Sequence, residues 1–110
     1  MEITKEKRNG ITCLRIEGSL DASNSSIAKK NIRDIIVAEG ANLIINLSEL
    51  QYISSAGLRV ILVVAKDIKN KNGKLVLCSM THNVKRDFDI SGFTSMFDIQ
   101  DNIEAALKRF

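Results

Sequence analysis

The 110-residue chain has few of the features that mark a membrane protein or a secreted one. It contains no proline, no tryptophan, one histidine and two cysteines. No stretch approaches the roughly 18 uncharged apolar residues that a membrane-spanning helix needs. Residues 1–5 lack the apolar core of a signal peptide. We therefore expect a cytoplasmic protein that does not insert into a membrane.

The chain also lacks the patterns that nucleic-acid-binding proteins use. Sixteen basic and thirteen acidic residues leave a net charge of +3, and the two signs are mixed along the chain. Only four phenylalanines and one tyrosine are available as stacking platforms. Dense basic stripes and zinc-ligand spacings are missing as well. The sequence therefore argues against direct binding of nucleic acid.

Groups that perform catalysis are equally scarce. The single histidine, His82, lies in a turn-like segment before a short helical pattern, away from any nucleophile motif. Neither a G-x-S-x-G elbow nor a G-x-x-x-x-G-K phosphate loop is present. Cys13 and Cys78 lie among apolar residues without a C-x-x-C pair or a metal-ligand spacing. We interpret both as core residues and predict that the protein is not an enzyme.

What the sequence does contain is a regular alternation of strands and helices after an opening hairpin. Asn9-Gly10, between the strand patterns 2–8 and 11–17, favours the type I′ turn of a two-residue hairpin. The further elements that we predict are a helix at 27–40, a strand at 43–47, a helix at 55–71, a strand at 74–78, a helix at 84–90, a strand at 95–99 and a helix at 101–110. Crossovers of this length connect parallel strands, so we expect one α/β domain over residues 1–110 with a mixed sheet.

Two adjacent serines, Ser54 and Ser55, lie where a loop turns into an apolar helix. Either hydroxyl can act as the N-cap, which accepts a hydrogen bond from a first-turn N–H and contributes about 0.5–2 kcal/mol. A helix N-terminus also stabilises a phosphate, because its N–H groups are unpaired and carry partial positive charge. The position therefore fits either a structural cap or a phosphorylation switch.

The helix at 55–70 has two different faces when it is projected at about 100° per residue. Its core face carries Gly57, Val60, Ile61, Val64 and Ile68, and its other face carries Ser55, Arg59, Leu62, Val63, Lys66 and Asn70. Aliphatic side chains between basic ones indicate a docking surface, with cover by another helix or loop as the alternative. A phosphate on Ser55 would lie within roughly 6–11 Å of Arg59 and Leu62. We expect such a charge to abolish docking.

Four segments, in this order, resemble the STAS domain family, and within it the bacterial anti-sigma factor antagonists. They are I-E-G-S-L-D at 16–21, L-I-I-N-L-S at 43–48, Y-I-S-S-A-G-L at 52–58 and V-K-R-D-F-D-I-S-G-F at 84–93. The resemblance runs essentially from end to end. It implies the STAS fold, an α/β fold in which a mixed sheet of four to five strands carries about four helices, packed mainly on one face.

The mechanism that this resemblance implies is partner switching. An unmodified antagonist binds an anti-sigma factor and frees a sigma factor, the serine kinase activity of that partner switches the antagonist off, and a metal-dependent serine/threonine phosphatase restores it. By position, Ser55 is the phosphoacceptor and Asp21 is the loop acid of the partner surface. Together with the helix face, the expected partner-binding residues are Asp21, Ser54, Ser55, Arg59, Leu62, Val63 and Lys66. The kinase partner consumes the ATP, so no cofactor is expected here.

The sequence departs from the family pattern beside the acceptor serine. Ser54 stands where members often carry an acid, and Ala56 stands where a hydroxyl often follows, so Ser54 is an alternative acceptor. Small STAS proteins are also similar to the cytoplasmic subunit that braces the ATPase of lipid-trafficking ABC transporters. In that alternative Ser55 is only a cap. A signalling scaffold with a different output would use the same switch.

Overall fold

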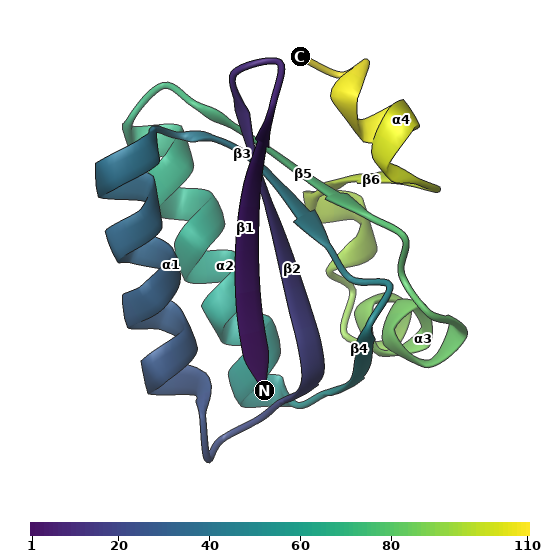
Figure 1. Cartoon of the computed structure of the whole chain (residues 1–110). Helices are drawn as coiled ribbons and strands as arrows, with labels where there is room; N and C mark the ends of the chain where they lie inside the picture. The colour runs from purple at the N-terminus through teal and green to yellow at the C-terminus, as the bar shows by residue number, and fades with distance from the viewer.

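The computed structural model describes residues 1–110 and consists of one mixed β-sheet with helices on both faces (Figure 1). In chain order the elements are β1 (Glu2–Arg8), β2 (Ile11–Leu20), α1 (Ser25–Glu39), β3 (Asn42–Asn46), β4 (Leu50–Ile53), α2 (Ser55–Asn70), β5 (Lys74–Cys78), α3 (His82–Ile90), the short 3₁₀ helix η1 (Thr94–Met96), β6 (Asp98–Gln100) and α4 (Ile103–Leu107). None of the helices has the length and apolar character that a membrane crossing requires.

The sheet has the strand order β1-β2-β3-β5-β6, and β4 pairs with the last residues of β2. β1 and β2 are antiparallel, and every other pair is parallel. The predicted mixed α/β fold is confirmed, with six strands where the sequence led us to expect four or five. The additional strand is β4, which has only four residues and pairs with Gly18–Leu20.

The C-terminal elements are shorter than the sequence pattern predicts. Residues 94–96 form a 3₁₀ turn, so the strand predicted at 95–99 begins only at Asp98. Phe97, between the two, places its ring against Phe88 with ring centroids 5.9 Å apart, which is a packing contact. The last helix begins at Ile103 because Asn102 caps it, with its Oδ1 accepting the Ala105 N–H at 2.8 Å.

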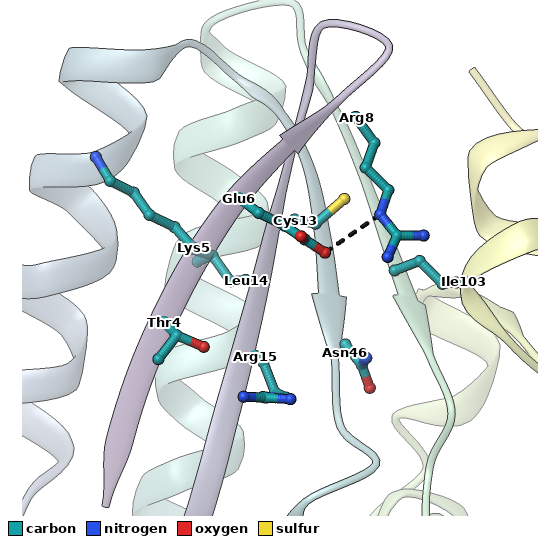
Figure 2. A pocket seen from close by; sticks show the side chains of 9 residues that line it. All are labelled: Thr4, Lys5, Glu6, Arg8, Cys13, Leu14, Arg15, Asn46 and Ile103. Atoms are coloured by element: carbon teal, nitrogen blue, oxygen red, sulfur yellow. Dashed lines mark ion pairs between the residues drawn. The ribbon is translucent and has the colours of Figure 1, made fainter.

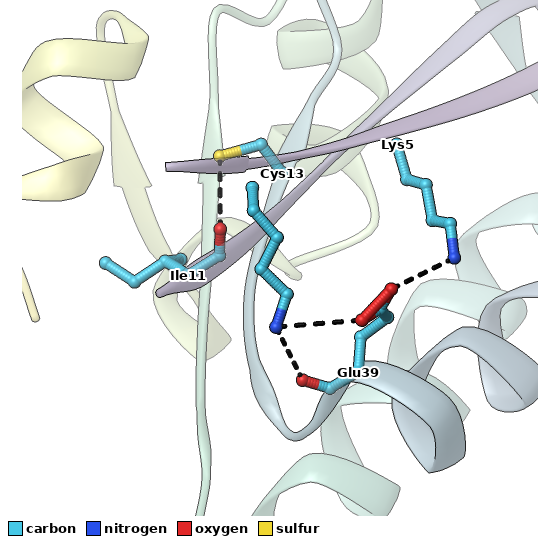
Figure 3. Close-up of polar contacts among 5 residues, drawn as sticks. Lys5, Ile11, Cys13 and Glu39 are labelled. Carbon is cyan, nitrogen blue, oxygen red and sulfur yellow. Dashed lines mark hydrogen bonds and ion pairs between the residues drawn. The ribbon is translucent and has the colours of Figure 1, made fainter. Parts of the chain in front are cut away.

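The opening hairpin has the predicted turn and is attached to α1. Asn9 and Gly10 have φ values of 54° and 78°, which is the left-handed conformation that a type I′ turn needs. At the end of α1, the Glu39 carboxylate lies 3.2 Å from Lys5 Nζ, and Lys7 Nζ donates to the Glu39 carbonyl at 3.1 Å (Figure 3). The hydrogen bond from Lys5 holds the pKa of Glu39 below its ordinary value. These contacts connect the edge strand to the helix layer.

The sheet has a core on each face. The larger core, between the sheet and α1, α2 and α3, includes Leu14, Ile16, Leu43, Ile45, Ile61, Val64 and Phe88. The smaller core, beneath α4, consists of Ile11, Cys13, Ile44, Val76, Cys78 and Ala106. Both cysteines are buried, as predicted, and burial raises the pKa of each thiol. Three helices thus cover one face, and the short α4 covers part of the other.

Helix α2 approaches the end of β2 most closely at Gly57. A Cβ atom at this position would stand 2.5 Å from the Leu20 carbonyl oxygen and 2.7 Å from Ile53 Cγ1. The first of these neighbours is backbone and has little freedom to move. Only glycine fits between the helix and the two strand ends.

We expect Gly57→Ala to lower the free energy of unfolding by about 1–3 kcal/mol, because overpacking at this contact forces the helix away from Leu20. This range is the net change, after the gain of about 1 kcal/mol in helix propensity that alanine brings. Urea unfolding followed by circular dichroism measures the change. The control is Asn70→Ala at the exposed end of the same helix, which should lose no stability. Equal or greater stability of Gly57→Ala would show that the contact is not tight.

Thr12 is the one buried side chain whose polar atom has no hydrogen-bond partner, and it is only 1% exposed. Replacing its hydroxyl with a methyl group removes an unsatisfied polar atom at nearly constant volume. Thr12→Val should therefore raise the free energy of unfolding by about 1 kcal/mol. The same substitution at exposed Thr4 on β1 serves as the control and should give a change of less than about 0.5 kcal/mol. A loss of stability in Thr12→Val would contradict this interpretation.

Candidate functional site

The candidate site lies at the end of the sheet where β2 and β4 finish side by side. β2 ends at Leu20 and β4 ends at Ile53, and these two residues are partners in the parallel pairing. Directly after β4, the Ser54 N–H donates to the Leu20 carbonyl at 2.9 Å. Asp21 follows Leu20 in the chain, and Ser55 follows Ser54. The fold therefore brings the Asp21 loop and the start of α2 to the same place.

The structure gives the two serines different roles. Ser54 is the N-cap of α2, has extended backbone angles, and accepts the Gly57 N–H on its Oγ at 3.3 Å. Its side chain is partly buried. Ser55 is the first residue of the helix and is exposed. The capping role thus belongs to Ser54, and Ser55 presents its hydroxyl to solvent.

The loop that carries Asp21 is held by hydrogen bonds among its own side chains. Asp21 Oδ1 accepts from the Ser23 hydroxyl at 2.6 Å and from the Ser23 N–H at 2.9 Å. Asn24 Oδ1 accepts the Asp21 N–H at 3.0 Å, and Asn24 Nδ2 donates to the Ser19 carbonyl at 2.8 Å. The Ser23 hydroxyl, followed by the Ser23 N–H, holds the pKa of Asp21 below its ordinary value. The carboxylate is therefore ionised at neutral pH.

The outer face of α2 is partly covered by α1. Arg59 and Lys66 are exposed, whereas Leu62 and Val63 are partly buried. The two helices lie side by side on one face of the sheet (Figure 1). A groove of about 100 Å³ between them is lined by Ser25, Lys29, Ala56, Arg59, Val60 and Val63. Of the predicted residues, Arg59 and Val63 therefore belong to a groove shared with α1, while Leu62 and Lys66 lie outside its lining.

Sequence reasoning missed the contributions of α1 to this site. Lys29 lines the groove, and further along the same helix pair Arg33 Nε lies 2.6 Å from Asp67 Oδ2. The regular spacing of Lys29 and Arg33 places them one turn apart on α1. The sequence does not show that this row lies against α2. It also gives no sign that Gly57 touches Leu20.

A second hollow, of about 250 Å³, lies on the α4 side of the sheet (Figure 2). Its lining is formed by Thr4, Lys5, Glu6, Arg8, Cys13, Leu14, Arg15, Asn46 and Ile103. Both arginines are paired with neighbouring glutamates, Arg8 with Glu6 at 3.2 Å and Arg15 with Glu17 at 3.3 Å. None of the predicted site residues lines it, so it is separate from the candidate site.

A curated relative matches this chain over its full length. It is BtrV of Bordetella bronchiseptica, a candidate anti-sigma factor antagonist. The two sequences are 34% identical over 110 residues, which is 100% of this chain and 95% of the relative. The compared region therefore spans the Asp21 loop, both serines and α2.

Solved structures show the same fold. A candidate anti-sigma factor antagonist from Thermotoga maritima superposes with a TM-score of 0.90 at 23% identity, covering 97% of this chain and 92% of that one. The anti-sigma factor antagonist SpoIIAA matches in its unphosphorylated form with a TM-score of 0.73, at 18% identity and with coverage of 98% and 96%. The phosphorylated form of SpoIIAA, from Bacillus, matches with a TM-score of 0.74, at 20% identity and with 98% coverage of both chains.

The family model of the STAS domain matches residues 2–106. The matched region begins with β1, includes the junction of β2, β4 and α2, and ends within α4. The fold, the sequence identity over the full length and this match agree with one another. The chain belongs to the STAS domain family.

Proposed function

We propose that this chain is an anti-sigma factor antagonist that acts by partner switching in the cytoplasm. Its unphosphorylated form binds an anti-sigma factor that has serine kinase activity, and a sigma factor is released. Phosphorylation of Ser55 abolishes this binding, and a serine/threonine phosphatase reverses the modification. In this scheme the chain is a regulatory binding protein rather than an enzyme. The observation that carries the proposal is the exposed Ser55 hydroxyl at the start of α2, next to a serine that already caps the helix.

The position of Ser55 supports its role as the acceptor. A phosphate there adds a charge of about −1.5 to −2 near a helix N-terminus, which favours negative charge. The fold need not rearrange to accommodate the phosphate, because Ser55 is exposed and does not cap the helix. Phosphorylation of Ser54 would instead esterify the oxygen that accepts the Gly57 N–H and place a doubly charged group at a partly buried position. The proposal therefore assigns the switch to Ser55 and the cap to Ser54.

The proposed partner surface is centred on the junction between the β2 end and α2. Asp21 contributes an ionised carboxylate from a loop that its own hydrogen bonds hold in place. The surface comprises Asp21, Ser54, Ser55, Arg59, Leu62, Val63 and Lys66. Similarity to BtrV over the whole chain supports this function, and so does the occurrence of the fold in phosphorylated and unphosphorylated SpoIIAA.

We expect Ser55→Asp to weaken binding to the cognate anti-sigma factor at least tenfold, about 1.4 kcal/mol, because it places a charge inside the footprint. Ser55→Ala should bind like the wild type and should stay active when ATP is added. Isothermal calorimetry with each purified anti-sigma factor of the host measures both effects. Ser95→Asp, at an exposed serine in η1, is the control for the added charge. Unchanged affinity of Ser55→Asp would refute the switch.

Ser54→Ala separates the cap from the acceptor. Loss of the bond to the Gly57 N–H should lower the free energy of unfolding by about 0.5–2 kcal/mol. Phosphate incorporation by the kinase partner, measured by intact-protein mass spectrometry, should be retained. Ser55→Ala is the matched comparison and should show the opposite pattern, with stability unchanged and incorporation lost. If Ser54→Ala loses incorporation and Ser55→Ala keeps it, then Ser54 is the acceptor.

A further inference from the structure

The contact between α1 and α2 contains an ion pair toward the C-termini of the two helices and unpaired positive charges toward their N-termini. Toward the helix C-termini, Arg33 on α1 pairs with Asp67 on α2, with Nε–Oδ2 and Nη2–Oδ1 distances of 2.6 and 3.3 Å. One turn nearer the N-termini, the corresponding residues are Lys29 on α1 and Val63 on α2. Asp67 neutralises Arg33, but the residue of α2 beside Lys29 is the uncharged Val63.

This N-terminal half of the contact is the groove lined by Ser25, Lys29, Ala56, Arg59, Val60 and Val63. Its lining contains two cations and no acidic side chain. Neither Lys29 nor Arg59 takes part in an ion pair of the structure, whereas Lys30 and Arg33, also on α1, are both paired. Ser25 and the apolar side chains of Ala56, Val60 and Val63 form the rest of the lining. The groove therefore suits one carboxylate beside a small apolar contact.

Ser55 lies in line with this groove along α2. Ser55, Arg59, Val63 and Asp67 follow one another at intervals of four residues, so they form one row on the helix surface. Neighbours in such a row have Cβ atoms about 5–6 Å apart, which is the spacing of helical ion pairs. A phosphate on Ser55 would thus stand next to Arg59, at the mouth of the groove. It would supply the anion that this half of the helix contact lacks.

We propose that the α1–α2 groove binds an acidic side chain of the anti-sigma factor, and that phosphate on Ser55 prevents this by pairing with Arg59 and Lys29 in its place. This inference rests on the function proposed above and specifies its chemistry. Charge complementarity selects the occupant, because the groove has two unpaired cations. Inactivation then depends on the two cations and not only on the bulk or hydration of the phosphate.

The intramolecular part of the proposal is tested without a partner. Protein carrying genetically encoded phosphoserine at position 55 is titrated by phosphorus-31 NMR, in the wild type and in Arg59→Gln and Lys29→Gln. A cation beside the phosphate favours the dianion and lowers its second pKa, which is normally near 6. Arg59→Gln should therefore raise the phosphate pKa by about 0.3–0.7 pH units. Lys29→Gln should raise it by less, because Lys29 lies level with Val63, two turns along α2 from Ser55. Lys69→Gln, at an exposed lysine near the end of α2, is the control and should leave the phosphate pKa unchanged.

Equal phosphate pKa values in the wild type and in Arg59→Gln would overturn the pairing. The helix N-terminus lowers the phosphate pKa in all of these proteins, so it does not affect the comparison. The difference between variants isolates the contribution of the groove cations.

The acidic occupant is tested with the anti-sigma factor that binds the wild type. Arg59→Gln and Lys29→Gln should each weaken binding about three- to tenfold, and Lys69→Gln should stay within about twofold. In the wild-type background, Ser55→Asp should weaken binding to the anti-sigma factor at least tenfold. In the double variant Lys29→Gln/Arg59→Gln the same change should weaken binding by less than about threefold, because no cations remain to be captured.

Two outcomes of this cycle would contradict the proposal. Full affinity of the double variant would mean that no acidic side chain uses the groove, and an undiminished effect of Ser55→Asp in that variant would mean that the phosphate acts without the cations. If no anti-sigma factor of the host binds the wild type, then the proposed function fails and the acidic occupant fails with it. The pairing of phosphate with Arg59 is decided by the titration alone, so the two failures are distinguishable.

Discussion

The hydrogen bond from the Ser54 N–H to the Leu20 carbonyl, 2.9 Å long, positions the rest of the candidate site. It joins the end of β2, which leads into the Asp21 loop, to the N-cap residue of α2. Gly57 lies against the same carbonyl and keeps the helix close, since any side chain there would collide with it. The placement of Ser55 relative to Asp21 therefore depends on backbone contacts. The side chains that would contact a partner extend from this backbone arrangement.

In the proposed switch, the structural and the regulatory role belong to neighbouring residues, Ser54 and Ser55. Ser54 satisfies the helix end, which leaves the Ser55 hydroxyl free to change its charge without loss of the cap. The loop hydrogen bonds keep Asp21 ionised, while Lys29 and Arg59 give the adjoining groove the opposite sign. A phosphate on Ser55 would enter a surface that already contains both charges. In the proposed switch a local change of charge would therefore alter binding without any movement of the fold.

Some elements could be predicted from the sequence because local signals specify them. Asn9-Gly10 determines the hairpin turn, and the apolar period after a capping serine determines α2 almost to the residue. β4 has four residues, of which the middle two are exposed, so it shows no recognisable pattern. The role of Lys29 could not be predicted, because it depends on which helices are neighbours. Pairings between distant segments, such as Leu20 with Ser54, are a property of the fold and leave no local signature.

The most direct measurement is tandem mass spectrometry of the protein purified from its own host under several growth conditions, with and without phosphatase treatment. It reports which serine carries phosphate and whether the occupancy changes. We expect phosphate on Ser55 that rises and falls with growth condition and disappears with phosphatase, while Ser54 remains unmodified. Persistent absence of phosphate from Ser55 under every condition would contradict the switch and would leave the helix cap at Ser54 as the one role assigned to the two serines.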